Sequence, residues 1–209
     1  ELSPLHNPGA LAGLEACEAL APSIANVTVF DTAFHQTMPE IAYMYNIPYE
    51  MYEKYKIRRY GFHGTSHRYI KDTIRELLGE ENTKKIITCH IGQGASICAI
   101  KDGKSIDTSM GLTPLGGIMM GTRCGDLDPA IPLFIMQKRG LTISETDNRL
   151  NKKSGFLGIF GESSDFRDIQ KGIEEGKERA KLAYEMFCYR VRNFIGAYTI
   201  ALGGLDAIV

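Results

Sequence analysis

The sequence lacks an excess of charge of either sign. Its 209 residues include 24 Lys and Arg and 25 Asp and Glu. A protein that binds nucleic acid or an anionic membrane surface through bulk electrostatics needs a marked positive excess. We therefore expect a small-molecule ligand, with no nucleic acid and no membrane among the partners.

Paired cysteines are missing too. The five cysteines, at positions 17, 89, 98, 124 and 188, form no CxxC pair and no zinc-ligand spacing. An odd number of cysteines in a chain of this size is typical of free thiols in a reducing compartment. The cysteine pattern predicts a cytoplasmic location, without a disulfide framework or a metal site.

A long apolar run is also absent. Charged residues or Gly interrupt each apolar segment before the roughly 20 residues that a membrane-spanning helix needs. The apolar fraction of 44% is ordinary for a soluble globular protein. We also expect no signal peptide. It begins at Glu1 without Met and ends at Val209 inside an expected strand, so we expect an internal piece of a longer chain.

Helix and strand patterns alternate along the first part of the chain. Residues 7–20 predict a helix. The β-branched run at 26–30 predicts a buried strand with Asp31 at its carboxyl end, which is the edge where α/β sheets bind ligands. An amphipathic helix is expected from the cap residue Ser66 through Leu78.

Three short strands follow in a hairpin-like order. They are expected at 86–89, 97–100 and 105–108, with an Asp102-Gly103 turn between the last two. The segment 111–125 is rich in Gly and too irregular for a helix or strand. A loop of that length in a compact domain is usually functional.

The last third of the chain is expected to be mainly helical. Asp128-Pro129 predicts a helix that ends near Arg139-Gly140. Apolar residues at helical spacing predict one long buried helix from about Gly172 to Leu202. Residues 206–209 begin a further strand.

The pentapeptide Gly92-Gln93-Gly94-Ala95-Ser96 lies between two of these strands. Missing side chains let backbone N–H groups face an anion, and a hydroxyl is nearby. Taken alone, the pentapeptide favours a tight hairpin that needs Gly at positive φ. Its setting of strand, loop, strand, Asp-Gly turn and third strand resembles the second phosphate-binding loop of the actin-like, sugar kinase and Hsp70 ATPase superfamily.

The nonapeptide at 59–67, Arg-Tyr-Gly-Phe-His-Gly-Thr-Ser-His, resembles a characteristic segment of acetate kinases. Further segments match that family in order along the chain, at 5–8, 30–35, 90–96, 113–117, 121–126 and 163–167. The resemblance covers essentially all 209 residues, and the chain is identified as a member of the acetokinase family. It implies an α/β fold, an actin-like ATPase (ribonuclease H-like) domain with a mixed sheet flanked by helices.

The resemblance also implies an activity and a domain division. Acetate kinases transfer a phosphoryl group reversibly and in line between ATP and acetate, giving acetyl phosphate and ADP, with Mg²⁺ accompanying ATP; a homodimer is expected. Residues 1–30 are expected to end the N-terminal actin-like domain, and residues 31–209 to form most of the nucleotide-binding C-terminal domain, truncated before the adenosine motif. The family's N-terminal phosphate loop, substrate Arg and metal ligands lie outside this chain, so we expect the isolated piece to be inactive.

Three residues match the family's catalytic positions: Asp31, His63 and Arg123. The resemblance places Asp31 near the acid and the metal-bound phosphates, His63 against the transferring phosphoryl group, and Arg123 as a charged clamp on its oxygens. Without it, they would be a turn-capping Asp, a structural His and a surface Arg. His63 and His67 have a spacing that binds zinc on a helix, but Gly64 puts His63 before the helix. We therefore reject zinc and expect His67 to hydrogen-bond in the helix cap.

Binding residues follow from the same resemblance. The nucleotide-binding set is His90, Ile91, Gly92, Gln93, Gly94, Asp165, Phe166 and Arg167. An apolar pocket for the methyl end of the acid is implied at Leu5, Phe62 and Pro114. Taken singly, these three would be assigned to a core and the 165–167 triplet to a surface turn. Gln93 stands where the family commonly has Asn, so we expect a longer or differently aimed phosphate contact there.

Other functions stay open from the sequence. Propionate kinases share much of the pattern, and one methylene in an apolar pocket is worth only about 1–3 kcal/mol. A non-catalytic nucleotide switch of the Hsp70 or actin kind fits the hairpin loop alone, although His63 and Arg123 oppose it. As an isolated piece, the chain can also be an inert nucleotide-binding or dimerisation domain.

Overall fold

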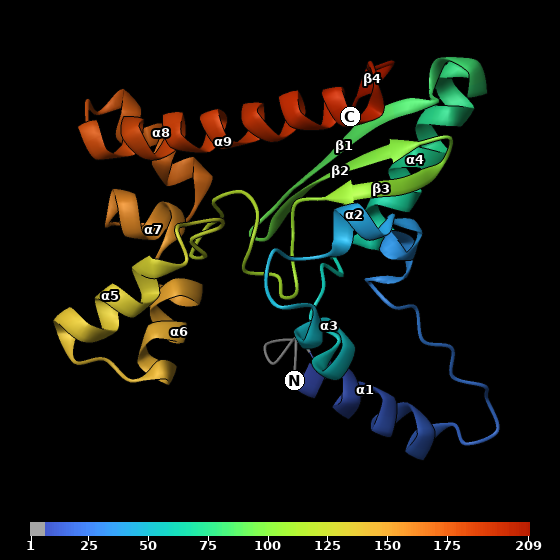
Figure 1. Ribbon diagram of the computed structural model, residues 1–209, viewed down its shortest axis with the longest axis horizontal. Coiled ribbons are helices and arrows are strands. Elements are labelled where there is room, and N and C mark those ends of the chain that lie inside the picture. Colours follow the sequence, from blue (N-terminus) through green and yellow to red (C-terminus); the bar gives the residue numbers. More distant parts are fainter. Residues whose placement is uncertain (1–6) are drawn as a thin grey trace.

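A four-stranded sheet forms the centre of the computed structural model, which describes residues 7–209 (Figure 1). Its strands are β1 (Lys85–Ile91), β2 (Ala95–Lys101), β3 (Lys104–Thr108) and β4 (Ala207–Ile208), in the order β3-β2-β1-β4. The β1–β2 and β2–β3 pairs are antiparallel, whereas β4 is parallel to β1. The expected mixed sheet, with its three hairpin-linked strands and a last strand near residue 206, is confirmed.

Helices make up most of the remaining structure. They are α1 (Asn7–Leu20), α2 (Glu40–Tyr43), α3 (Tyr49–Tyr55), α4 (Gly64–Leu78), α5 (Ala130–Arg139), α6 (Ile143–Lys152), α7 (Gly155–Phe160), α8 (Phe166–Glu174) and α9 (Glu178–Leu202), with 3-10 turns η1 (Ala33–Thr37) and η2 (Glu80–Asn82). In Figure 1 the long α9 runs along the sheet, and α5 to α8 gather at the end of α9 farthest from β4. No helix within residues 7–209 is both long and apolar enough to cross a bilayer.

Alternating side chains of the sheet fill two apolar clusters, because successive strand residues point to opposite faces. On one face, Ile86 and Ile100 lie with Ile74 of α4. On the other, Ile87 belongs to a larger cluster that includes Leu202 of α9. Burial on both faces explains why the strands read as nearly continuous apolar runs.

The predicted strand at 26–30 is wrong. This segment pairs with no strand in the described part of the chain, and Val27 is 83% exposed. A β-branched run forms a strand only where a neighbouring strand and a buried face are available. Figure 1 shows the segment as an irregular trace between α1 and η1, and α1 itself has no buried residue.

The predicted long helix from 172 to 202 is two helices. Gly172 lies in α8, Gly176 adopts a left-handed φ of 77°, and α9 begins only at Glu178. The positive φ ends the first helix and lets the chain turn back, so that α8 packs on α9. The buried stripe of α9 runs through Ala183 and Phe187, so the helix is only partly buried.

The helix predicted from Ser66 begins two residues earlier, at Gly64, and ends at Leu78 as expected. Ser66 therefore lies in the first turn of α4 and is not its cap. The cap is His63, so the expectation that this histidine precedes the helix is confirmed. The segment 111–125 contains no helix or strand, as predicted.

Candidate active site

The turn before α4 has an unusual backbone that Asp31 holds in place. His63 has φ 58° and ψ 25°, a left-handed conformation that is costly for a residue other than Gly. The backbone N–H of His63 donates to Asp31 Oδ2 at 2.6 Å, and the N–H of Gly64 donates to the Asp31 carbonyl at 2.8 Å. Asp31 thus accepts the backbone N–H groups of both residues, which fixes where the imidazole points.

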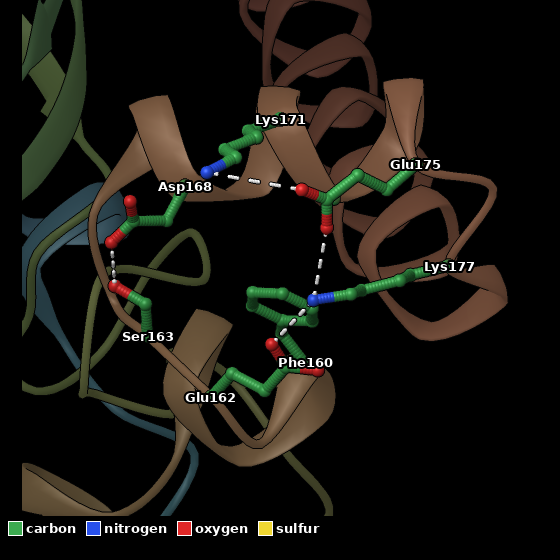
Figure 2. A pocket seen from close by; sticks show the side chains of 8 residues that line it. Phe160, Glu162, Ser163, Asp168, Lys171, Glu175 and Lys177 are labelled. Carbon is green, nitrogen blue, oxygen red and sulfur yellow. Dashed lines mark hydrogen bonds and ion pairs between the residues drawn. The ribbon is translucent and has the colours of Figure 1, made fainter.

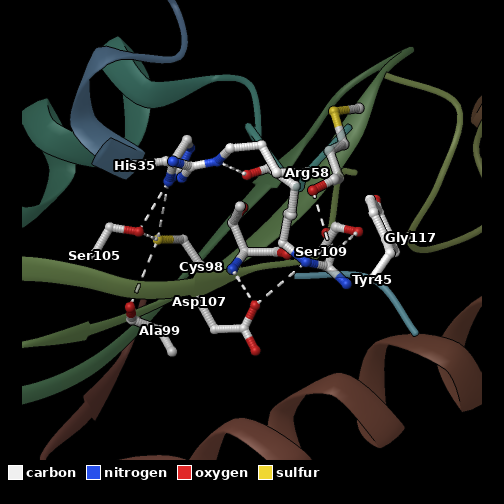
Figure 3. A network of polar contacts seen from close by, with 12 residues as sticks. His35, Tyr45, Arg58, Cys98, Ala99, Ser105, Asp107, Ser109 and Gly117 are labelled. Carbon is white, nitrogen blue, oxygen red and sulfur yellow. Dashed lines mark hydrogen bonds and ion pairs between the residues drawn. The ribbon is translucent and has the colours of Figure 1, made fainter. Parts of the chain in front are cut away.

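Two further side chains fasten the segment that leads into His63. His35 Nε2 donates to the Phe62 carbonyl at 2.8 Å, and its Nδ1 lies 2.9 Å from Ser105 Oγ. Because a carbonyl only accepts, His35 carries its proton on Nε2 and takes the Ser105 hydroxyl proton at Nδ1. Arg59 Nη1 donates to the Thr108 carbonyl at 2.7 Å. Figure 3 shows His35 directed at Ser105, so β3 is the support for this segment.

The side chains of His63 and Arg123 converge above Gly94. A methyl group at Gly94 would lie 3.4 Å from His63 Nε2 and 3.2 Å from Arg123 Nη1. Arg123 Nη1 also donates to the Pro114 carbonyl at 3.2 Å, and burial lowers the pKa of this guanidinium. The structure therefore brings two nitrogen groups to one small space beside the loop between β1 and β2.

The glycines of that loop serve close approach and not a left-handed turn. The predicted tight hairpin is confirmed, because Ile91 pairs with Ala95 across the loop. The expected need for Gly at positive φ is wrong, because neither Gly92 nor Gly94 has a positive φ. A side chain at Gly94 would instead fill the space between His63 and Arg123. The missing Cβ leaves that space open to a ligand.

Four histidine rings lie close together beside this space: His35, His63, His67 and His90. The rings of His63 and His90 stack with centroids 4.0 Å apart, and His90 Nδ1 lies 2.9 Å from Ser66 Oγ. Burial, with smaller contributions from His90 and Arg123 and an opposing one from Asp31, lowers the pKa of His63 to about 4. His63 is therefore neutral near pH 7. Within residues 7–209, no three His, Cys, Asp or Glu side chains converge as a set of metal ligands.

The predicted role of His67 in the helix cap is wrong. His67 is 1% exposed, with Nδ1 2.7 Å from Thr88 Oγ1 and Nε2 2.8 Å from Ser96 Oγ. Its partners are hydroxyls of the sheet, because the side chain of the fourth residue of α4 points down onto β1 and β2. Burial lowers the pKa of His67 to about 2.

A cavity of about 380 Å³ joins two segments that lie more than seventy residues apart. It is lined on one side by Ile91, Gly92 and Gln93 and on the other by Asp165, Phe166 and Arg167. All six were predicted to bind nucleotide. Phe156 and Phe187, which no motif singled out, also line the cavity. The apolar periodicity of α9 was the signal that could have indicated Phe187.

Asp165 and Arg167, which both line this cavity, form an ion pair with each other. Asp165 caps α8 by accepting the Arg167 backbone N–H at 2.8 Å, and its other oxygen accepts from Arg167 Nη2 at 2.6 Å. These hydrogen bonds lower the pKa of Asp165 to about 2. Phe166 is 37% exposed between them, so an aromatic face is available to a flat ligand.

A second, more polar cavity of about 270 Å³ is lined by residues of α8 and of the segments next to it, from Phe160 to Ser163 and at Lys177. Figure 2 shows Lys177 between Glu162 and Glu175, at 2.7 Å and 3.2 Å. Ser163 donates to Asp168 at 2.6 Å. The three carboxylates of the lining outnumber its two lysines, and exposed ion pairs of this kind are worth only about 0–1 kcal/mol each. Their effect is to tie the ends of α7, α8 and α9 together.

The predicted acid pocket is only partly described. Leu5 lies outside the described residues. Phe62 is half-buried against the main apolar cluster and directly precedes His63. Pro114 holds Arg123 through its carbonyl. Both are therefore adjacent to the two side chains that converge above Gly94.

We expect the protein to lose stability as the pH falls below about 6.5. Burial lowers the folded-state pKa of His35, His63 and His67, whereas in the unfolded chain these groups have pKa values near 6.5. The unfolded state therefore binds protons first. The stability conferred by the neutral side chains is complete above about pH 6.5. It is lost on acidification by about 1.4 kcal/mol per pH unit for each proton taken up on unfolding.

Urea denaturation at closely spaced pH values from about 7.5 to about 5 measures this slope. His67→Gln removes one of the titrating groups, so it should flatten the dependence as well as lower the overall stability. A free energy of unfolding that is constant across this range in the wild type would contradict the neutral, buried state of the histidines.

Comparison with known proteins gives the same assignment along the whole chain. The sequence model of the Acetokinase family matches residues 1–209. The acetate kinase of Dictyoglomus turgidum is 61% identical to this chain over 210 aligned residues, which cover 100% of this chain and 52% of that protein. The acetate kinase of Caldicellulosiruptor saccharolyticus is 60% identical over 210 aligned residues, which cover 100% of this chain and 53% of that protein. The chain thus spans about half the length of the curated relatives it matches.

Solved structures of the same kind share the fold. An acetate kinase from Porphyromonas gingivalis matches with a TM-score of 0.93 at 53% identity, covering 98% of this chain and 52% of that one. A propionate kinase from Francisella tularensis subsp. tularensis matches with a TM-score of 0.94 at 47% identity, covering 98% and 53%. The expected actin-like ATPase fold is confirmed. Because the family model matches the whole sequence and the fold agrees with these solved structures, the chain belongs to the acetokinase family.

Proposed function

We propose that the full-length protein containing this chain is an acetate kinase, an ATP:acetate phosphotransferase that acts on a carboxyl group. The convergence of His63 Nε2 and Arg123 Nη1 above Gly94 carries the proposal. Two nitrogen donors beside one small space can stabilise the oxygens of a phosphoryl group during its transfer. A protein that only bound nucleotide would not need this pair.

The reaction needs positioning more than acid–base chemistry. An acetate oxygen attacks the γ-phosphorus of ATP, and the new O–P bond forms as the bond to the bridging oxygen of ADP breaks. The electron pair leaves with ADP. Because acetate is already an anion, no proton has to be removed. Arg123 contributes permanent charge on the equatorial oxygens, and neutral His63 contributes a hydrogen bond.

Asp31 acts mainly through His63 in this proposal. Its carboxylate accepts the His63 backbone N–H, which supports a role in keeping the imidazole aimed at the phosphoryl group. Because the side chain of Asp31 is exposed, it is also the carboxylate of the site that a hydrated Mg²⁺ could meet. Mg²⁺ that travels with ATP needs only one or two protein carboxylates, and it would offset charge on the phosphates.

The nucleotide extends from the phosphate loop to α8. His90, Ile91, Gly92, Gln93 and Gly94 are proposed to contact the phosphates, and Asp165, Phe166 and Arg167 the adenosine. The cavity lined by residues of both segments supports this direction. Leu5, Phe62 and Pro114 are proposed to enclose the methyl end of the acid, since the last two adjoin His63 and Arg123.

The remaining expectations belong to the same proposal. Residues 1–30 end an N-terminal actin-like domain, and residues 31–209 form most of the C-terminal one. The whole enzyme is a cytoplasmic homodimer, and the 209-residue piece is inactive without the missing half. The lack of buried residues in α1 and the exposure of residues 26–30 support the division, because these segments find no core of their own here.

Trapping of the product with hydroxylamine tests the activity. The full-length protein with acetate, ATP and Mg²⁺ should yield acetohydroxamate, because only an acyl phosphate gives this adduct. The isolated 209-residue chain, assayed in parallel, should yield none. ATP hydrolysis by the full-length protein without hydroxamate would identify a nucleotide switch instead of a kinase.

Propionate is the alternative acceptor, because a propionate kinase has the same fold over this region. A single methylene changes kcat/KM by a factor of only about 10–200. The ratio of kcat/KM for acetate to kcat/KM for propionate, at the same Mg-ATP concentration, distinguishes an acetate kinase from a propionate kinase.

A further inference from the structure

A chain of hydrogen bonds runs from the sheet to His63. Thr88 Oγ1 lies 2.7 Å from His67 Nδ1, His67 Nε2 lies 2.8 Å from Ser96 Oγ, and Ser96 Oγ lies 2.9 Å from His63 Nδ1. Thr88, His67 and Ser96 are 0–1% exposed. Water therefore has no access to these three groups, and the protons must be shared among them.

Each hydrogen bond in this series has one donor and one acceptor. The Ser96 hydroxyl has one proton, so it can donate to only one of its two imidazole partners and must accept from the other. The same holds for the neutral ring of His67, which has one N–H and one bare nitrogen. The four groups therefore have two consistent arrangements, in which all protons point toward His63 or all point away from it.

Thr88 decides between the two arrangements. Within residues 7–209, the only hydrogen-bond partner of its hydroxyl is His67. If His67 donated to Thr88, the buried hydroxyl proton of Thr88 would have no acceptor, which costs about 1–3 kcal/mol. If Thr88 donates to His67, every proton in the chain has an acceptor. The favoured arrangement thus runs from Thr88 through His67 and Ser96 to the bare Nδ1 of His63.

We infer that Ser96, set by His67 and Thr88, fixes neutral His63 in the tautomer that carries its proton on Nε2. This inference rests on the proposed function, in which Nε2 meets the phosphoryl group. With the proton there, His63 and Arg123 present two donors to the space above Gly94. The opposite tautomer would aim a lone pair at a phosphate oxygen and repel it.

The surroundings of His63 are consistent with this role. His90 stacks on its ring at 4.0 Å, which restricts rotation of the imidazole about its bonds. The His63 ring is neutral near pH 7 because burial lowers its pKa to about 4, so it has only one proton to place. Ser96 and Thr88 are positioning residues, since neither reaches the space above Gly94 itself.

Nitrogen NMR of the full-length protein labelled with ¹⁵N-histidine tests the inference without any substrate. Solid-state spectra distinguish a protonated ring nitrogen from a bare one, and a His63→Gln spectrum identifies the His63 signals. The wild type should show His63 with a protonated Nε2 and a bare Nδ1. A protonated Nδ1 would overturn the inference, whether or not the protein makes acetyl phosphate.

Two substitutions test whether the chain causes the tautomer. Ser96→Ala removes the last donor, and Thr88→Val removes the first while keeping the side-chain shape, so the second variant serves if the first does not fold. Each should give His63 a mixture of both tautomers and lower kcat by about 10- to 100-fold with little change in KM for ATP. Thr88→Ser restores the hydroxyl and should restore both signals. A pure Nε2–H signal in Thr88→Val would overturn the inference.

Discussion

Arg123→Ala is expected to lower kcat of the full-length protein by about 10³-fold or more, as for other arginines that stabilise phosphoryl transfer. Arg123 Nη1 lies over Gly94 beside His63 and is held there by the Pro114 carbonyl. Its charge is half-buried, so its attraction for phosphate oxygens is screened less than at the surface. Truncation to Ala removes this charge where negative charge is proposed to accumulate in the transition state.

Arg123→Lys is the matched variant, because it keeps a charge but not the planar fork. It should recover only part of the lost rate. Arg167→Ala serves as a second control, since Arg167 is exposed at the proposed adenosine end and its loss should act mainly on KM for ATP. Thermal unfolding of all three variants checks that the fold persists. If Arg123→Ala changes only KM for ATP, then this arginine binds nucleotide and does not stabilise the transition state.

Short-range features of the fold were predictable because their causes lie within a few residues. The Asp102-Gly103 turn has φ values of 49° and 78°, a conformation that Asp-Gly adopts readily and that joins two strands with the correct twist. Gly140 ends α5 at φ 63° for a similar reason. The strands at 86–89 and 97–100 followed from their apolar runs.

Features that depend on distant partners were not predictable in this way. Residues 26–30 have the composition of a strand but lack a neighbour to pair with in the described chain. Apolar spacing also extended the last helix across Gly176, where only the backbone angle reveals the break. The composition of a segment indicates its strand propensity, whereas strand formation also depends on a neighbouring strand to pair with.

The candidate site divides in the same way. The motifs picked out His63, Arg123 and Gly94 as functional residues, and the structure brings all three together, although their catalytic roles stay predictions. The motifs gave no indication of Thr88, and assigned His67 to a helix cap. The hydrogen bonds from His67 to Thr88 and Ser96 join residues up to 29 positions apart, so no local sequence pattern could reveal them.

Gly94→Ala is expected to lower kcat by about 10²-fold or more while leaving the fold intact. The new methyl group would lie 3.2 Å from Arg123 Nη1 and 3.4 Å from His63 Nε2, in the space where the phosphoryl oxygens are proposed to sit. A displacement of about 1 Å at a reacting centre costs about 10²-fold in rate. Because Gly94 has no positive φ, Ala meets no backbone strain there, and the effect should come from the occupied space alone.

Gly196→Ala is the control for this substitution. Gly196 lies inside α9, and a methyl group there meets no atom within 4 Å, so the change should leave kcat unaltered and raise stability by up to about 1 kcal/mol. Both variants are compared with the wild type by kcat, by KM for ATP and acetate, and by thermal unfolding. Normal kcat in Gly94→Ala, with a folded protein, would mean that the phosphoryl group does not pass between His63 and Arg123. The transfer would then have to occur elsewhere in the protein, and the close approach of these two side chains would serve only to pack the loop between β1 and β2.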